Sequence, residues 1–143
     1  MMNKTIRGAA KAAVAVTAAA AAVLGATGSA SATSSQGIIP GQSLNVGDSI
    51  VSPSGVYQLI LQSDGNLVEY RGSGSGRTVC WATGTNGSAA HHASYQSDGN
   101  FVLYTQYGTA LWSSNSAGTA AISVVIANDG VVLVGQKRIT GAC

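Results

Sequence analysis

Three stretches of the sequence repeat one pattern and decide the fold: Leu61-Gln-Ser-Asp-Gly-Asn-Leu-Val-Glu-Tyr70, Tyr95-Gln-Ser-Asp-Gly-Asn-Phe-Val-Leu-Tyr104 and Ile126-Ala-Asn-Asp-Gly-Val-Val-Leu-Val-Gly135. Their Asp-Gly pairs begin at positions 64, 98 and 129, so the units follow each other at 34 and 31 residues. An Asp-Gly pair between runs of alternating apolar residues is a strong signal for a β-hairpin. The repeat therefore predicts three similar hairpins.

Large apolar side chains stand at every second position on both sides of each turn, which predicts one buried face per hairpin. We place the first loop at the three residues Asp64-Gly65-Asn66. The side chains expected to face inward are Tyr57, Leu59, Leu61 and Leu67 in the first unit, Ala93, Tyr95, Phe101 and Leu103 in the second, and Ile122, Val124, Ile126, Val132 and Val134 in the third. Glu69 is the exception among these apolar residues, because its odd-numbered position turns a charged side chain inward. We expect it near a sheet edge.

Tryptophans follow the first two hairpins, with Trp81 eleven residues after Tyr70 and Trp112 eight after Tyr104. Cys143 stands eight residues after Gly135, so we expect it in the place of a third tryptophan. Two more short strands fit the segment 41–51, and no helical period appears after Thr33. The sequence therefore predicts an all-β domain of three similar sheets around one core, with the tryptophans at its centre.

The first 32 residues have the pattern of a secretory signal peptide. Lys4 and Arg7 precede the apolar stretch 12–24, which is shorter than the roughly 20 residues that cross a bilayer. Ala30-Ser-Ala32 supplies a small-residue cleavage site. We expect residues 1–32 to be removed, residues 33–143 to form an extracellular domain, and the alanine-rich core to indicate a bacterial source. An alanine-rich helix packed on the domain is the alternative, disfavoured because no polar stripe recurs at helical spacing.

Charge and composition exclude several classes of function. The net charge of +2 owes much to three basic residues among the first eleven, and the remainder holds four basic against five acidic residues. A nearly neutral domain without a basic run is not expected to bind nucleic acid, and we expect no insertion into membranes. We expect no metal and no cofactor, because His91 and His92 lack ligand spacing.

The two cysteines, Cys80 and Cys143, both lie in the predicted domain. In an oxidising compartment an even pair favours one disulfide, which here would link residues 63 positions apart. An intermolecular bond and free thiols are the alternatives.

Two of the three outward faces carry the same five side chains: Gln62, Asp64, Asn66, Val68 and Tyr70 on the first, and Gln96, Asp98, Asn100, Val102 and Tyr104 on the second. Amide, carboxylate and phenol groups both donate and accept hydrogen bonds, as the adjacent hydroxyls of a neutral sugar require. The valine offers a small apolar wall for the C–H face of a sugar ring. With one carboxylate in each set, the pattern indicates binding without cleavage.

The spacing Q-x-D-x-N-x-V-x-Y in both units resembles the signature of the bulb-type mannose-binding lectins, the family of snowdrop lectin. This resemblance covers about residues 36–143. It implies a β-prism II fold of three four-stranded antiparallel sheets with pseudo-threefold symmetry and one α-D-mannose site per sheet. It also implies that the aspartate and asparagine contact the 2-hydroxyl, glutamine the 3-hydroxyl, tyrosine the 4-hydroxyl and valine the ring carbons.

The third unit departs from the family pattern. Ala127, Val131, Leu133 and Gly135 replace the amides, valine and tyrosine, and only Asp129 remains, so we expect this site to be degenerate. Its apolar outward residues suit contact with another chain. The family's usual internal cysteine pair is missing, so the resemblance implies no disulfide pairing. A homodimer is one expected state, although the chain stops before the strand that many relatives exchange.

Three rival interpretations remain. Gln, Asp and Asn near a turn also cap their own backbone, so the motif has a purely structural interpretation. Enzyme activity is not expected, because Asp64 and Glu69 fall on opposite faces and no nucleophile motif occurs. The sequence favours a secreted, non-catalytic mannose-binding lectin. The alternative is a lectin-like bacteriocin or inhibitory protein. Such a protein would act on a competitor's surface through rhamnose or mannose polymers or through a protein surface.

Overall fold

The computed structural model describes residues 32–143, and the predicted leader lies outside that part of the chain except for Ala32. The described chain is built from β-strands, together with one 3-10 turn, η2 (Gly74–Gly76). In this part of the protein no helix has the length and apolar character needed to span a membrane.

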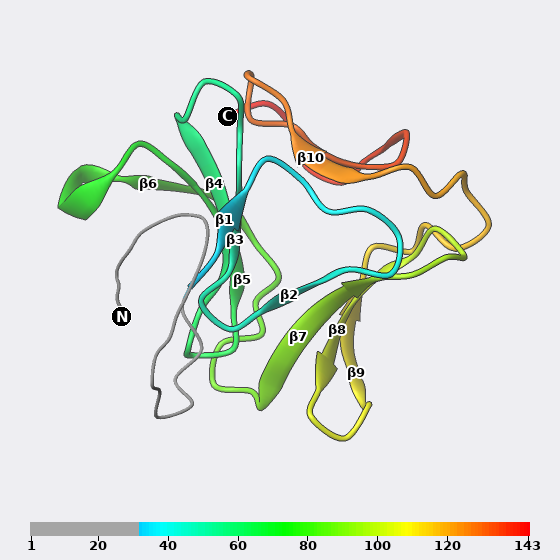
Figure 1. Ribbon diagram of the computed structural model, residues 1–143. Coiled ribbons are helices and arrows are strands. Elements are labelled where there is room, and N and C mark those ends of the chain that lie inside the picture. The colour runs from blue at the N-terminus through cyan, green and yellow to red at the C-terminus, as the bar shows by residue number, and fades with distance from the viewer. Residues whose placement is uncertain (1–31) are drawn as a thin grey trace, which may run out of the picture. The chain divides into compact units, whose positions relative to one another are not determined.

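The strands form three sheets around a common core (Figure 1). The first sheet has the order β1 (Ser34–Ser35), β3 (Ser49–Val51), β4 (Tyr57–Leu61), β5 (Leu67–Arg71), β6 (Thr78–Ala82). The second has the order β2 (Ser43–Asn45), β7 (Ala90–Tyr95), β8 (Phe101–Thr105), β9 (Ala110–Ser113), and the third the order β10 (Val124–Ile126), β11 (Val132–Val134), β12 (Lys137–Arg138). The all-β prism of three sheets is thus confirmed, with five, four and three strands instead of four in each.

The unequal strand numbers come from the N-terminal segment, which contributes to every sheet. β1 pairs in parallel with β3, Ile38 bridges Val124 of β10, and β2 pairs with β7. Figure 1 shows this segment in cyan, passing from β1 to β10 and then running beside β7 as β2. Of the two strands predicted within residues 41–51, only β3 therefore belongs to the first sheet. The segment links all three sheets through backbone hydrogen bonds.

The predicted alternation of inward side chains is confirmed in all three hairpins. The buried residues that form the core include Tyr57, Leu59, Leu61, Leu67, Ala93, Tyr95, Phe101, Leu103, Val124, Ile126, Val132 and Val134. The prediction that Ile122 also faces inward is wrong, because this residue precedes β10 and its side chain is 51% exposed. Burial of this continuous apolar set is the main stabilising contribution to the fold.

Two details of the first hairpin differ from expectation. Leu61 pairs with Leu67, so the loop between the paired residues Gln62 and Asn66 is Ser63-Asp64-Gly65, one residue earlier than predicted. The inward and outward faces are unchanged, because both registers pair odd positions with odd positions. Glu69 does not lie at a sheet edge: β5 runs between β4 and β6, and the Glu69 side chain is fully buried.

The tryptophans meet as predicted, with ring centroids 5.5 Å apart and an edge-to-face angle of 69°. Both are half-buried and pack against the core. Cys143 is not in the third tryptophan position. Trp81 pairs with Glu69 and Trp112 with Leu103, and the corresponding partner of Val134 is Lys137. Only the two residues Gly135 and Gln136 connect β11 to β12, which brings the equivalent position forward in the sequence.

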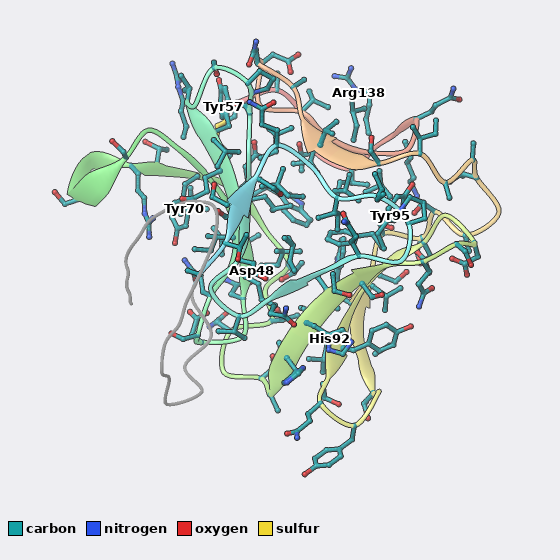
Figure 2. All side chains as sticks on the ribbon, viewed as in Figure 1. Asp48, Tyr57, Tyr70, His92, Tyr95 and Arg138 are labelled. Carbon is teal, nitrogen blue, oxygen red and sulfur yellow. A yellow bond between two sulfur atoms is a disulfide. The ribbon has the colours of Figure 1, made fainter. Side chains whose placement is uncertain are left out.

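Cys80 and Cys143 form the predicted intramolecular disulfide, with their Cα atoms 5.7 Å apart. The bond joins β6 of the first sheet to the end of the third unit. The backbone amide of Cys143 donates to the carbonyl of Asp129 at 2.9 Å, and the hydroxyl of Tyr57 donates to the carbonyl of Cys143 at 2.8 Å (Figure 2). Three separate contacts thus hold Cys143 against the first and third sheets.

Candidate functional site

The first polar set gathers on the outer face of β4 and β5, around the turn that joins them. Gln62 and Asn66 flank the loop, Asp64 is exposed at its tip, and Val68 and Tyr70 follow on the outer face of β5. The amide nitrogen of Gln62 donates to the hydroxyl of Tyr70. The structure therefore brings together all five predicted residues, with the glutamine and tyrosine in direct contact.

The second hairpin repeats this arrangement on β7 and β8. Gln96 donates to the hydroxyl of Tyr104, and the backbone amide of Asn100 donates to Oδ1 of Asp98 at 2.9 Å. The corresponding bond in the first hairpin, from Asn66 to Asp64, is also 2.9 Å long. The two clusters share their side chains and their internal hydrogen bonds, which is the geometry expected of two sites for one kind of ligand.

The asparagines also have a structural role that the sequence did not reveal. Oδ1 of Asn66 accepts hydrogen bonds from the hydroxyl of Thr83 and the backbone amides of Gly84 and Thr85, at 3.0, 3.0 and 3.2 Å. The oxygen therefore clamps the loop after β6 against the hairpin. Among the described residues Nδ2 of Asn66 has no hydrogen-bond partner, so it is the atom that can donate to a ligand.

Asn100 forms the same clamp on the loop after β9. Its Oδ1 accepts from the hydroxyls of Ser113 and Ser114 and from the backbone amide of Ser116, at 3.0, 3.2 and 3.2 Å. The repeated segments after the tryptophans, Thr83-Gly-Thr85 and Ser114-Asn-Ser116, were the available signal for these supporting residues. Their small hydroxyl side chains at matching positions hold the two clusters in one shape.

The Asp-Gly turn itself belongs to the framework and not to the ligand site alone. Gly99 has φ +90°, and a Cβ there would overlap the backbone oxygen of Thr119. Gly65 has φ +89°, and a Cβ there would lie only 2.7 Å from the backbone and side-chain oxygens of Ser88. Both features require glycine. Retention of an Asp-Gly pair in the third unit is therefore explained by the turn, without a ligand.

The third hairpin keeps the turn and lacks the polar set. Asp129 Oδ1 accepts from the backbone amide of Val131 at 3.1 Å, as in the other two turns. Val131 is buried where the asparagines stand, so no asparagine oxygen holds the neighbouring loop. Instead the Thr140 hydroxyl donates to the carbonyl of Gly130 at 3.3 Å and accepts from the backbone amide of Val132 at 2.9 Å, and the amide of Cys143 donates to the carbonyl of Asp129. With Ala127 and Gly135 in place of glutamine and tyrosine, this face has no equivalent hydrogen-bonding cluster.

Within residues 32–143, two titratable groups have clearly shifted pKa values. Burial raises the pKa of Glu69 to about 7, with a further contribution from the negative charge of Asp129. Neither carboxylate oxygen of Glu69 has a hydrogen-bond partner among the described residues, and the side chain faces the core, away from Asp64. Burial also lowers the pKa of His92, as does the neighbouring His91. No group of metal-ligating residues occurs within residues 32–143.

A hollow of about 440 Å³ opens beside the first cluster. It is lined by Gln62 and Asp64 of the cluster, by Arg77 from the segment before β6, and by apolar side chains that include Val46 and Ile60. The guanidinium carbon of Arg77 lies 3.7 Å from the centroid of the Tyr70 ring. The first cluster thus has a shallow cavity with polar and apolar walls.

Comparisons with known proteins agree with this geometry, although no family model matches the chain. The chain is 40% identical over 85 residues to the mannose-specific lectin of Aloe arborescens, covering 57% of this chain and 74% of that protein. It is 38% identical over 74 residues to the B-type lectin plumieribetin of Scorpaena plumieri, covering 52% of this chain and 61% of plumieribetin, which is less than two thirds of its length.

Among solved structures, the mannose-specific agglutinin of snowdrop (Galanthus nivalis), complexed with methyl α-D-mannoside, is similar with a TM-score of 0.60 and 29% identity. The match covers 68% of this chain and 86% of the agglutinin. The three sheets and the repeated hairpin clusters, together with the 40% identity over most of the Aloe lectin, show the family. The chain belongs to the bulb-type mannose-binding lectins.

Proposed function

We propose that this protein is a secreted lectin that binds mannose-containing glycans at two sites, one on each intact hairpin. The observation that carries the proposal is the duplicated cluster, in which a glutamine bonded to a tyrosine, an exposed aspartate and a free asparagine Nδ2 share one outer face. The chain is a binding protein and not an enzyme, since its relatives are lectins. Residues 1–32 act as its export signal in this proposal.

The purely structural interpretation explains only part of the cluster. It accounts for Oδ1 of each asparagine and for the aspartate oxygen that closes each turn. It does not account for glutamine and tyrosine, because the third hairpin folds with alanine and glycine in their places. The outward polar atoms that the framework does not use are therefore the ones assigned to the sugar.

Each site is shallow, so we expect weak binding of a single mannose and stronger binding of a glycan that reaches both sites. The third face, with Val131 buried and Leu133 half-buried on β11, is assigned no sugar.

The test is a site-resolved NMR titration of the exported protein with methyl α-mannoside and with galactose. We expect amide shifts around Gly65 and Gly99 with the mannoside, and none around Gly130 or with galactose. Tyr104→Phe removes one hydroxyl and should weaken mannoside binding about fivefold at the second hairpin only. Tyr107→Phe is the matched control, because Tyr107 is 90% exposed in the β8–β9 turn. Absence of any mannoside shift at both hairpins would refute the proposal.

Action on a competitor's cell surface is the alternative role, and the apolar third face is the feature that suits it. Weaker mannoside binding at both hairpins without a weaker biological effect, in a Tyr70→Phe, Tyr104→Phe variant, would favour that role.

A further inference from the structure

The two sites share five side chains but differ in what lies against their tyrosines. The guanidinium of Arg77 covers the ring of Tyr70, whereas Tyr104 lies beside the ring of His92, with centroids 5.7 Å apart and planes inclined at 31°. Figure 2 labels Tyr70 and His92, one from each pair. Nδ1 of His92 is 3.0 Å from Nδ1 of His91, so the two imidazoles are engaged with each other. Among the described residues a permanent cation therefore lies against the tyrosine ring of the first site and not against that of the second.

Arg77 reaches Tyr70 because the connection between β5 and β6 is long. Six residues, 72–77, separate these strands, whereas four residues separate β8 from β9. The glycine-rich segment includes the turn η2, and the backbone amide of Arg77 closes it by donating to the carbonyl of Gly74 at 3.4 Å. This turn places Arg77 immediately before β6, where its side chain lies over the ring of Tyr70.

The hollow at the first site is therefore polarised. Asp64 and Gln62 line it together with Arg77, so a carboxylate and a guanidinium occupy the same cavity. Among the described residues no hydrogen bond or ion pair engages the Arg77 guanidinium, and its contact is with the face of the Tyr70 ring. A guanidinium stacked in this way keeps its N–H edge available, and that edge matches the two oxygens of a carboxylate or phosphate.

We propose that the first site prefers a mannose residue bearing one anionic group, a phosphate or a carboxylate, which Arg77 receives, while the second site prefers neutral mannose. This inference rests on the proposed function. The sugar hydroxyls lie against Asp64 and Gln62, and the anion lies against the N–H edge of Arg77 beside Tyr70. Because the guanidinium is exposed, the gain for an anionic ligand is about fivefold and not larger.

The test compares ligands at the two sites of the exported protein by the same NMR titration, using the amides of Gly65 and Gly99 as reporters. The ligands are methyl α-mannoside, mannose 6-phosphate, methyl α-mannuronoside, galactose 6-phosphate and inorganic phosphate. We expect mannose 6-phosphate or the mannuronoside to bind about fivefold more tightly than the neutral mannoside at the first site, with no gain at the second. Whichever anion shows the gain identifies the group. Raising the salt from about 0.01 M to about 1 M should abolish it.

Variants of two arginines separate the role of Arg77 from a general effect of charge. Arg77→Gln should abolish the preference for the anionic sugar at the first site, and Arg138→Gln, which removes the same charge from β12 of the third sheet, should retain it. An equal ratio of anionic to neutral affinity at both sites would overturn the inference. So would a preference that survives Arg77→Gln, or binding of inorganic phosphate or galactose 6-phosphate as tight as that of mannose 6-phosphate.

The two proposals fail in different ways. If the neutral mannoside shifts neither reporter, the lectin proposal itself fails. If the neutral mannoside shifts both reporters and the anionic sugars gain nothing at Gly65, the lectin proposal stands and only the inference about Arg77 is overturned.

Discussion

Replacing Glu69 by glutamine is predicted to stabilise the protein above about pH 7 and to change little near pH 4. The Glu69 carboxyl is fully buried and faces Leu59 and Trp81 across the neighbouring strands. Burial, reinforced by Asp129, raises its pKa from 4.5 to about 7. An ionised carboxylate without a hydrogen-bond partner is costly in such a place, and a neutral amide is less so.

The sign and size of the effect follow from this shift. In the unfolded chain Glu69 ionises near pH 4.5, whereas in the folded protein it keeps its proton up to about pH 7. Its contribution to stability is therefore fully present below about pH 4.5, falls as the pH rises to about 7, and is constant above. A pKa raised from 4.5 to about 7 corresponds to about 3 kcal/mol in the free energy of unfolding.

The assay is urea denaturation of wild type and Glu69→Gln between about pH 4 and pH 8, followed by the fluorescence of Trp81 and Trp112. The difference between the two proteins cancels other titrating groups, including His92, whose lowered pKa acts in the opposite direction. The stability of the variant relative to wild type should rise by about 3 kcal/mol across this range. A difference that does not change with pH would refute the reasoning.

Two further variants sharpen the interpretation. Glu69→Leu introduces the residue that stands at the equivalent position of the second sheet, Leu103, and should show the same change with pH. Asp129→Asn removes the negative charge that adds to the raised pKa of Glu69, so the upper end of the pH range over which stability falls should move to a lower pH.

Three other predictions concern the framework. Lys137→Met removes two hydrogen bonds of 2.9 Å, from Nζ to the carbonyls of Ser114 and Asn115. We expect mannoside binding to weaken about twofold to fivefold at the second hairpin and to stay unchanged at the first, as measured by site-resolved NMR. Cys143→Ser opens the disulfide between residues 63 positions apart and should lower the free energy of unfolding by about 4 kcal/mol; equal urea midpoints would contradict this. Gly99→Ala should destabilise the protein by about 2 kcal/mol more than Gly108→Ala, because both glycines have positive φ but only Gly99 is crowded, by the backbone of Thr119.

The parts of the fold that depend on neighbouring residues were predictable from the sequence. Alternation around each Asp-Gly pair gave the correct buried face of all three hairpins, because side-chain direction in a strand changes with every residue. The same rule explains why the faces were assigned correctly even though the first loop lies one residue earlier than predicted. The clustering of the predicted site residues also followed from this local pattern.

The features that the sequence did not reveal are contacts between distant segments. β2 pairs with β7, and Ile38 pairs with Val124. No motif or repeat in the sequence relates these segments to each other. The position equivalent to the tryptophans was assigned to Cys143 by counting, but the short turn at Gly135 moves Lys137 there. Glu69 was expected at an edge because burying a carboxylate is costly, yet the sheet covers it on both sides.

The hydrogen bonds of Thr33 have a consequence for the order of export and folding. Its backbone amide donates to Oδ1 of Asp48 at 2.9 Å, and its carbonyl accepts from the amide of Ser49 at 2.8 Å. Cleavage after Ala32, as proposed here, converts that amide into an ammonium group placed directly against a carboxylate. The neutral contact becomes a charge-assisted one, which is stronger. Removal of the leader would then hold β1 more firmly against the first sheet than in the precursor, in which β1 is already paired with β3.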